Sequence, residues 1–294
     1  MMNWVKKNIA LIVVILFLVF TGFTTIHDFL HEQSLQHKYY LEGQKECQKT
    51  GDYIVCSRYF EPYQKMDTIT SFGYMLFCYD STARLQLLAP LLVIIVVISK
   101  FHTYFHKTLK NSLTRVPYHK FLLKNYINVL KYSFIIPVFL LSLFIIAYFI
   151  SGNFDYKYSM KVFGYDAFGI ENAKNWLLFL FVYLFNFILR SIFWINIGLY
   201  NCKCNKNKII AIIISYVEYI MIFLVLETAI GETIFYQTDY MYYLLLTNVW
   251  AFSNVTLEGM TLMSFALAFL SLIILIFSYK DKESVLLEVE KWNI

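Results

Sequence analysis

Six long apolar runs set the main constraint on what this chain can fold into. A helix needs roughly 20 apolar residues, at about 1.5 Å rise each, to cross roughly 30 Å of hydrocarbon. The runs cover residues 8–26, 83–100, 132–150, 176–199, 208–227 and 261–279. With 59% hydrophobic and only 15% charged residues, the 294-residue chain lies far from the composition of a soluble domain. We therefore expect an all-α integral membrane protein, with six transmembrane helices in a single transmembrane domain over residues 1–294.

The distribution of charge predicts the orientation of these helices. No acidic residue occurs between Asp80 and Asp155, and residues 100–131 carry seven Lys and Arg. With both termini inside, cytoplasmic segments hold 15 Lys and Arg against 4 Asp and Glu, and external segments hold 9 against 15. Since Lys and Arg resist translocation, both termini are expected in the cytoplasm. The net charge of +5 then reflects topology and gives no case for nucleic acid binding. The composition is also typical of an AT-rich bacterial genome, so the expected location is the bacterial plasma membrane.

Two segments are expected outside the membrane. Residues 27–82 read as a polar, Tyr-rich external loop, and residues 228–260 as an external re-entrant hairpin before the last span, because their apolar run is too short to cross. In the first loop, Cys47 and Cys56 form a plausible disulfide, although free thiols fit the sequence equally well. The first apolar run ends without a small-residue cleavage site, which favours an uncleaved anchor helix.

The basic loop at 100–131 has a helical pattern of its own. Apolar residues recur at three-and-four spacing from Phe101 to Val116, with basic and polar residues on the opposite face. This amphipathic helix is expected to stop before Pro117, and a helix to resume from Tyr118 to Lys131 into the third span. A helix lying on anionic lipid headgroups and a docking helix for a cytoplasmic partner both fit this pattern.

The same loop resembles the first cytoplasmic loop of type-2 ABC exporter permeases. In that family a G-T-L-K-x-x-L-T-R-P-x-S-R helix-turn-helix follows the second span and forms the coupling helix, which fits a cleft in the ATP-hydrolysing subunit. Here Lys107 stands in place of the glycine, and one residue is inserted before the proline. The positions that match by type or carry the later positive charge are Thr108, Leu109, Lys110, Leu113, Thr114, Arg115, Pro117 and Lys120.

The resemblance implies one half of a translocation unit. The chain would pair with a second permease copy or a sibling permease, in contact with membrane lipid, above two ATP-binding cassette subunits. It contains no Walker A sequence, because no glycine is followed by lysine, so it is not expected to be an enzyme. ATP and Mg would bind the partner subunit, and this chain needs no cofactor. The exported substrate would be an amphipathic or hydrophobic peptide, lipid-linked glycan or drug.

Two charged residues fall inside predicted spans. Arg190 and Glu218 each lie about ten residues from the inner end of their helices, so both are expected near 15 Å depth. Because an isolated charge there is unfavourable by at least ~2.5 kcal/mol, an ion pair is the expected arrangement. The pair would fix helix register, or it would act in substrate passage or in relaying motion from the coupling helix. A third possibility is that it has the structural and the functional role together. If they pair, losing Glu218 alone would be worse than losing both charges.

Other motifs lead to weaker hypotheses. His27 and His31 have a spacing that can bind a metal, but no third ligand is defined, and no metal site is predicted. A different class of function is also compatible: a non-transporting immunity or sensory protein whose external loop binds a peptide. That alternative predicts that function survives disruption of residues 108–117.

Overall fold

The computed structural model describes residues 2–50, 63, 66–77, 80–103, 105, 115–154, 175–226, 228, 257–283 and 285–286, and the part it describes is helical, without strands. The helices are α1 (Met2–Thr50), α3 (Thr68–Phe77), α4 (Asp80–Thr103), α6 (Tyr118–Leu130), the 3-10 turn η3 (Lys131–Phe134), α7 (Ile135–Ser151), α10 (Trp176–Cys204), α11 (Lys208–Val225) and α13 (Leu257–Ser278).

Within these ranges, five helical segments are long and apolar enough to cross a membrane: Asn8–Lys49, Tyr118–Ser151, Trp176–Cys204, Lys208–Val225 and Thr261–Ser278. The chain is therefore a helical, multi-pass membrane protein. The apolar stretch of α4, Leu87–His102, is shorter, and its role as a sixth span stays a prediction. The predicted resumption of helix after Pro117 is confirmed, because α6, η3 and α7 follow one another from Tyr118 to Ser151.

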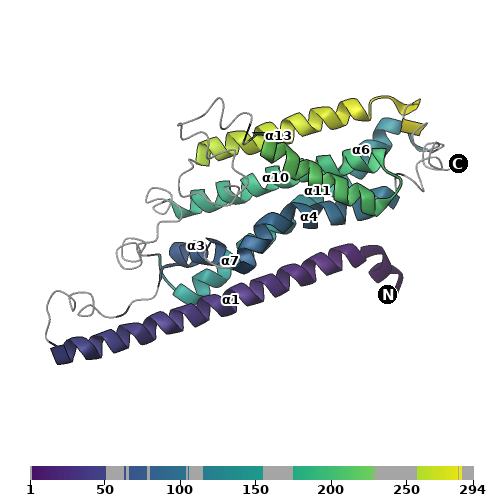
Figure 1. Cartoon of the computed structure of the whole chain (residues 1–294). Coiled ribbons are helices and arrows are strands. Elements are labelled where there is room, and N and C mark those ends of the chain that lie inside the picture. The colour runs from purple at the N-terminus through teal and green to yellow at the C-terminus, as the bar shows by residue number, and fades with distance from the viewer. Residues whose placement is uncertain are drawn as a thin grey trace.

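The helices alternate in direction, so that α1 begins and α13 ends at the same end of the bundle (Figure 1). We call this the near end. Three contacts define it: Lys100 of α4 donates to Asn8 of α1, Tyr118 of α6 to the carbonyl of Tyr279, and Lys203 of α10 to the carbonyl of Ser278. The opposite end is the far end.

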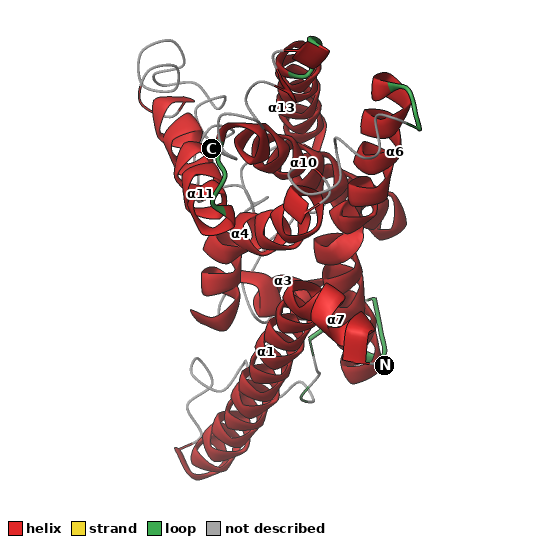
Figure 2. Cartoon of the chain, turned by 90° about the vertical axis from the view of Figure 1, so that its right-hand side faces the viewer, coloured by secondary structure: helices red, strands yellow, loops and turns green. Residues whose placement is uncertain are grey.

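The centre of the bundle is formed by α4 and α10, with α6, α11 and α13 around them and α1 at one side next to α3 and α7 (Figure 2). In α4 the run from Val93 to Ile98 is buried on almost every side. A helix that is apolar all round is expected to be enclosed by others. At Gly198, α10 packs directly against α4, because a Cβ there would lie 3.5 Å from the Ile98 side chain, in ordinary van der Waals contact.

Two residues of types that are common at helix ends mark the end of α7 and the start of α11. Gly152 follows α7 with φ of 73°, and its N–H bonds to the Tyr148 carbonyl 2.8 Å away, which closes the helix as glycine commonly does at this position. Asn207 begins α11, and its side chain accepts from the N–H of Ile209 at 2.8 Å.

The predicted external loop at 27–82 differs most from expectation. Its first part is not a loop, because α1 continues unbroken to Thr50 and extends beyond the rest of the bundle at the far end (Figure 1). Its 49 residues span roughly 73 Å, more than twice the hydrocarbon thickness. The polar residues here include many Glu, Gln and Lys, which are strong helix formers, as is the Leu between them. The change from apolar to polar residues therefore did not end the helix.

The second part of that segment contains α3, whose side chains are almost entirely buried. Asp67 caps its first turn: Oδ1 accepts from the N–H groups of Ile69 (2.8 Å) and Thr70 (3.2 Å), and Oδ2 from the Thr70 hydroxyl (2.5 Å). Phe72 packs edge-on against Phe144 of α7 at 5.4 Å between ring centroids. A buried helix thus precedes α4. The predicted re-entrant hairpin at 228–260 lies largely outside the described residues.

Candidate functional site

The part of the basic loop that follows the predicted coupling helix lies exposed at the near end. Arg115, Val116, Pro117, His119 and Lys120 are all accessible. The other predicted coupling positions, Thr108, Leu109, Lys110, Leu113 and Thr114, lie outside the described residues. The basic segment next to α6 is thus available to a partner, while its amphipathic helix stays a prediction.

Both flanks of the basic loop meet at one residue, Tyr279, directly after α13. Before the loop, the rings of Phe101 and Phe105 stack at 5.7 Å and pack edge-on against Tyr279, at 6.4 and 5.6 Å. After the loop, the Tyr118 hydroxyl donates to the Tyr279 carbonyl at 3.0 Å. The Tyr279 hydroxyl in turn donates to the carbonyl of Leu199 in α10 at 2.7 Å. Tyr279 therefore connects the loop to the centre of the bundle.

A row of polar contacts, which we call the polar seam, joins α10 to α13. Four side chains of α10 reach partners in α13 at a nearly constant sequence offset of 74 or 75 residues. The contacts are Asn186 Nδ2 to Thr261 Oγ1 (3.1 Å), Arg190 Nε to Ser264 Oγ (3.1 Å), Asn196 Nδ2 to Ser271 Oγ (2.9 Å) and Lys203 Nζ to the Ser278 carbonyl (2.8 Å). A constant offset means that the two helices run parallel.

Small residues make this close approach possible. The described buried positions of α13 are Ser264, Ala268, Ser271 and Leu275, and the first three are small. Small residues let membrane helices pack closely and hydrogen-bond. Asn196 extends the seam to a third helix, because its Oδ1 accepts from the Tyr126 hydroxyl of α6 at 3.1 Å. The seam therefore links α13, α10 and the helix that follows the basic loop.

Arg190 and Glu218 have separate partners and do not form the predicted ion pair among the described residues. The buried Arg190 donates to Ser264, and its guanidinium lies 5.6 Å from the centre of the Phe187 ring. Glu218 Oε2 accepts from Asn201 Nδ2 at 2.5 Å. Because α10 continues past Tyr200 to Cys204, Arg190 lies about one turn deeper than its spacing from Tyr200 suggested.

The cysteines differ between the two ends. Cys47, in the far-end extension of α1, is disulfide-bonded. The predicted partner, Cys56, lies outside the described residues. At the near end, Cys202 and Cys204 are free thiols, the first buried and the second exposed.

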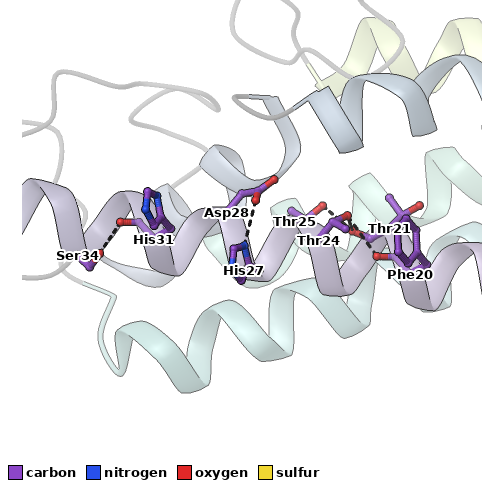
Figure 3. Close-up of polar contacts among 8 residues, drawn as sticks. All are labelled: Phe20, Thr21, Thr24, Thr25, His27, Asp28, His31 and Ser34. Atoms are coloured by element: carbon purple, nitrogen blue, oxygen red, sulfur yellow. Dashed lines mark hydrogen bonds and ion pairs between the residues drawn. The ribbon is translucent and has the colours of Figure 1, made fainter.

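Figure 3 shows local polar contacts of α1 between Phe20 and Ser34, where its far-end extension begins. His27 Nδ1 lies 3.3 Å from Asp28 Oδ1, and the hydroxyls of Thr24 and Thr25 donate to the Thr21 carbonyl, at 2.9 and 2.8 Å. Within the described residues, no group of three or more His, Cys, Asp or Glu could hold a metal ion.

Tyr63 packs against this extension. Its ring lies 4.5 Å from His37, and its hydroxyl donates to the Gln33 carbonyl at 3.4 Å. Burial raises the pKa of the Tyr63 phenol.

The fold and site together define a helical, multi-pass membrane protein with a basic near end. Comparison with known proteins adds no family: no family model matches the chain, and neither a curated protein nor a solved structure does.

Sequence reasoning did not single out Asn186, Asn196, Ser264, Ser271 or Tyr279. The seam residues carried one usable signal, which is Asn and Ser within otherwise apolar runs. Tyr279 had none, because one tyrosine at the end of a span resembles any interfacial aromatic residue.

Proposed function

We propose that this chain is the membrane-spanning permease subunit of an ABC exporter. It would move an amphipathic or hydrophobic substrate outward, and a separate ATP-binding cassette subunit would hydrolyse ATP with Mg. A second permease copy or a sibling permease would complete the unit in a bacterial plasma membrane. The substrate class stays open between a peptide, a lipid-linked glycan and a drug.

The observation that carries this proposal is the connection of the exposed basic loop to the bundle centre through Tyr279. A partner that pushes on residues 100–117 would act on Phe101, Phe105 and Tyr118, and all three contact Tyr279. Tyr279 bonds to α10, the helix that carries the polar seam. The segment from Thr108 to Pro117 resembles a coupling helix, which indicates an ATP-binding cassette subunit as the partner. The contacts of Tyr279 give the motion of that partner a path into the membrane.

The proposed orientation, with both termini in the cytoplasm, has support independent of charge counting. Disulfides persist in oxidising compartments and are rare in the cytosol. The disulfide-bonded Cys47 lies at the far end, and the free thiols of Cys202 and Cys204 lie at the near end. This distribution matches a cytoplasmic near end.

Co-purification tests the proposal. The wild-type chain, isolated from its native membrane in mild detergent, is expected to bring a Walker-containing ATPase with it. Arg115→Glu, alone and combined with Leu109→Glu, should lose that ATPase, because both changes place a carboxylate on the docking surface. Lys206→Glu is the matched control, since it reverses an exposed charge in the near-end connection between α10 and α11.

Two results would contradict the exporter proposal. One is a wild-type chain that arrives without an ATPase. The other is equal loss of the ATPase in the Arg115 and Lys206 variants, which would indicate a general effect of charge. The first result favours the alternative of a non-transporting immunity or sensory protein. The observation in favour of that alternative is the α1 extension, which presents a disulfide-bonded surface on the far side.

A further inference from the structure

A groove between α6 and α13 opens on the outside of the bundle at the near end. It has a volume of about 480 Å³, within the range of sites that hold small molecules. One wall comes from α6, the other from α13, and Leu199 of α10 lies at its base. Two exposed apolar side chains, Leu123 and Ile276, form its rims, and each is 59% accessible.

The groove is apolar along its length and polar only at one end. Tyr118 and Tyr126 line it, but their hydroxyls are bonded within the protein, to the Tyr279 carbonyl and Asn196 Oδ1. The remaining polar groups are the side chains of His119 and Lys280, one residue beyond Tyr118 and Tyr279. Because Tyr118 bonds to Tyr279, these two side chains flank the same corner of the groove.

Length and charge define the occupant. From Tyr118 to Tyr126 the groove follows α6 for roughly 12 Å, close to the roughly 15 Å of hydrocarbon in one leaflet. The side chains of His119 and Lys280 are both exposed, and among the described residues neither makes an ion pair. The nearby carboxylate of Asp281 bonds through Oδ1 to the N–H of Glu283 and does not line the groove.

We propose that this groove binds one anionic phospholipid of the near-end leaflet. An acyl chain would lie between α6 and α13, and the phosphate would accept from the Lys280 ammonium and the His119 imidazole. Basic pockets between transmembrane helices on the cytoplasmic side suit such headgroups. The inference does not depend on transport, so it can hold or fail separately from the exporter proposal.

The site can be tested with the full chain purified in mild detergent. Dioleoylphosphatidylglycerol or dioleoylphosphatidylcholine would be added at equal concentrations, and retained lipid counted by native mass spectrometry. The anionic lipid is expected as a single adduct with at least fivefold higher occupancy than the zwitterionic one. Inorganic phosphate at the same concentration should not displace it, since the acyl chain contributes to binding.

Two matched pairs of variants locate the site. Lys280→Gln should lower occupancy severalfold, while Lys282→Gln, the same change in charge two residues further on, should not. Ile276→Trp should fill the groove and lower occupancy, while Ile274→Trp should not, because Ile274 is 58% exposed on α13 but does not line the groove. All four positions are accessible, so the variants should keep the wild-type melting temperature.

Three outcomes would overturn the proposal. They are equal retention of both lipids, equal loss from Lys280→Gln and Lys282→Gln, or a dimer that dissociates in Ile276→Trp while lipid occupancy is unchanged. The last would show that a second copy of the chain covers the groove.

Discussion

Asn196 joins three helices of the bundle through its side chain. Its amide donates to Ser271 of α13 and accepts from Tyr126 of α6, while its backbone belongs to α10. Bonds of this kind average about 0.6 kcal/mol in membrane proteins, since the unfolded chain in lipid also finds partners. Their main contribution is to fix one register between helices that are otherwise apolar.

We expect Asn196→Ala to lower the free energy of unfolding by about 1 kcal/mol, because two interhelical bonds are lost. The measurement is a denaturant or thermal unfolding curve of the purified chain in detergent. Asn205→Ala is the control, since Asn205 bonds only to the Asn201 carbonyl of its own helix in the described structure. An equal loss in both variants would show that the seam adds nothing specific.

The two intramembrane charges illustrate what sequence reasoning could and could not supply. The presence of Arg190 and Glu218 within apolar runs could be predicted from the sequence. Their partners could not, because an extra turn at the end of α10 and the proximity of α13 decide them. Glu218 bonds to Asn201, which lies roughly 16 Å along the helix axis from Arg190.

The separation changes the expected result of a double-mutant cycle. The stability losses of Arg190→Leu and Glu218→Leu should add within about 0.5 kcal/mol, since the two residues share no described partner. Arg190→Leu combined with Ser264→Ala should lose less than the sum, because both remove the same contact. Recovery of stability in the Arg190 and Glu218 double variant would instead support an ion pair.

At the scale of elements, α3 shows how a short helix is held within a membrane protein. Asp67 satisfies two of its first N–H groups, and Thr68 bonds through its hydroxyl to Ser151 (2.7 Å) and to the Asn153 carbonyl (2.6 Å). These bonds join α3 to the far end of α7. Sequence analysis did not identify α3, because its ten residues are too few to register as a span.

We expect Asp67→Ala to destabilise the chain by about 1–2 kcal/mol, as the loss of a helix cap commonly does. Asp28→Ala is the control, because that carboxylate is 48% exposed beside His27. The readout is the unfolding midpoint in detergent, with proteolysis near α3 as a local measure. A similar shift in both variants would show that Asp67 acts only through its charge.

For the whole molecule, the membrane class, the spans 132–150, 176–199, 208–227 and 261–279, and the resumption of helix at Tyr118 followed from apolar runs and one proline. Such features depend on short stretches of sequence and can therefore be predicted from it. The packing of the helices cannot be predicted in this way, because α4 and α10 occupy the centre through contacts between segments far apart in sequence, such as Gly198 with Ile98.

Thiol labelling tests the orientation of the whole molecule. A membrane-impermeant maleimide should leave Cys204 unmodified in intact cells and label it after permeabilisation, because it is exposed at the near end. Cys202 should resist labelling until the chain is unfolded, since it is buried. Cys47 should react from outside only after reduction of its disulfide. Labelling of Cys204 in intact cells would reverse the proposed orientation.

The unbroken course of α1 has a mechanical consequence. A continuous helix transmits rotation along its whole length, whereas a hinge would absorb it. From residue 27 to Thr50 the arm measures roughly 36 Å, so a tilt of about 10° within the membrane would displace its tip by roughly 6 Å. Cys47, close to that tip, is disulfide-bonded. A small tilt of α1 among the packed helices can thus become a larger displacement at the far end.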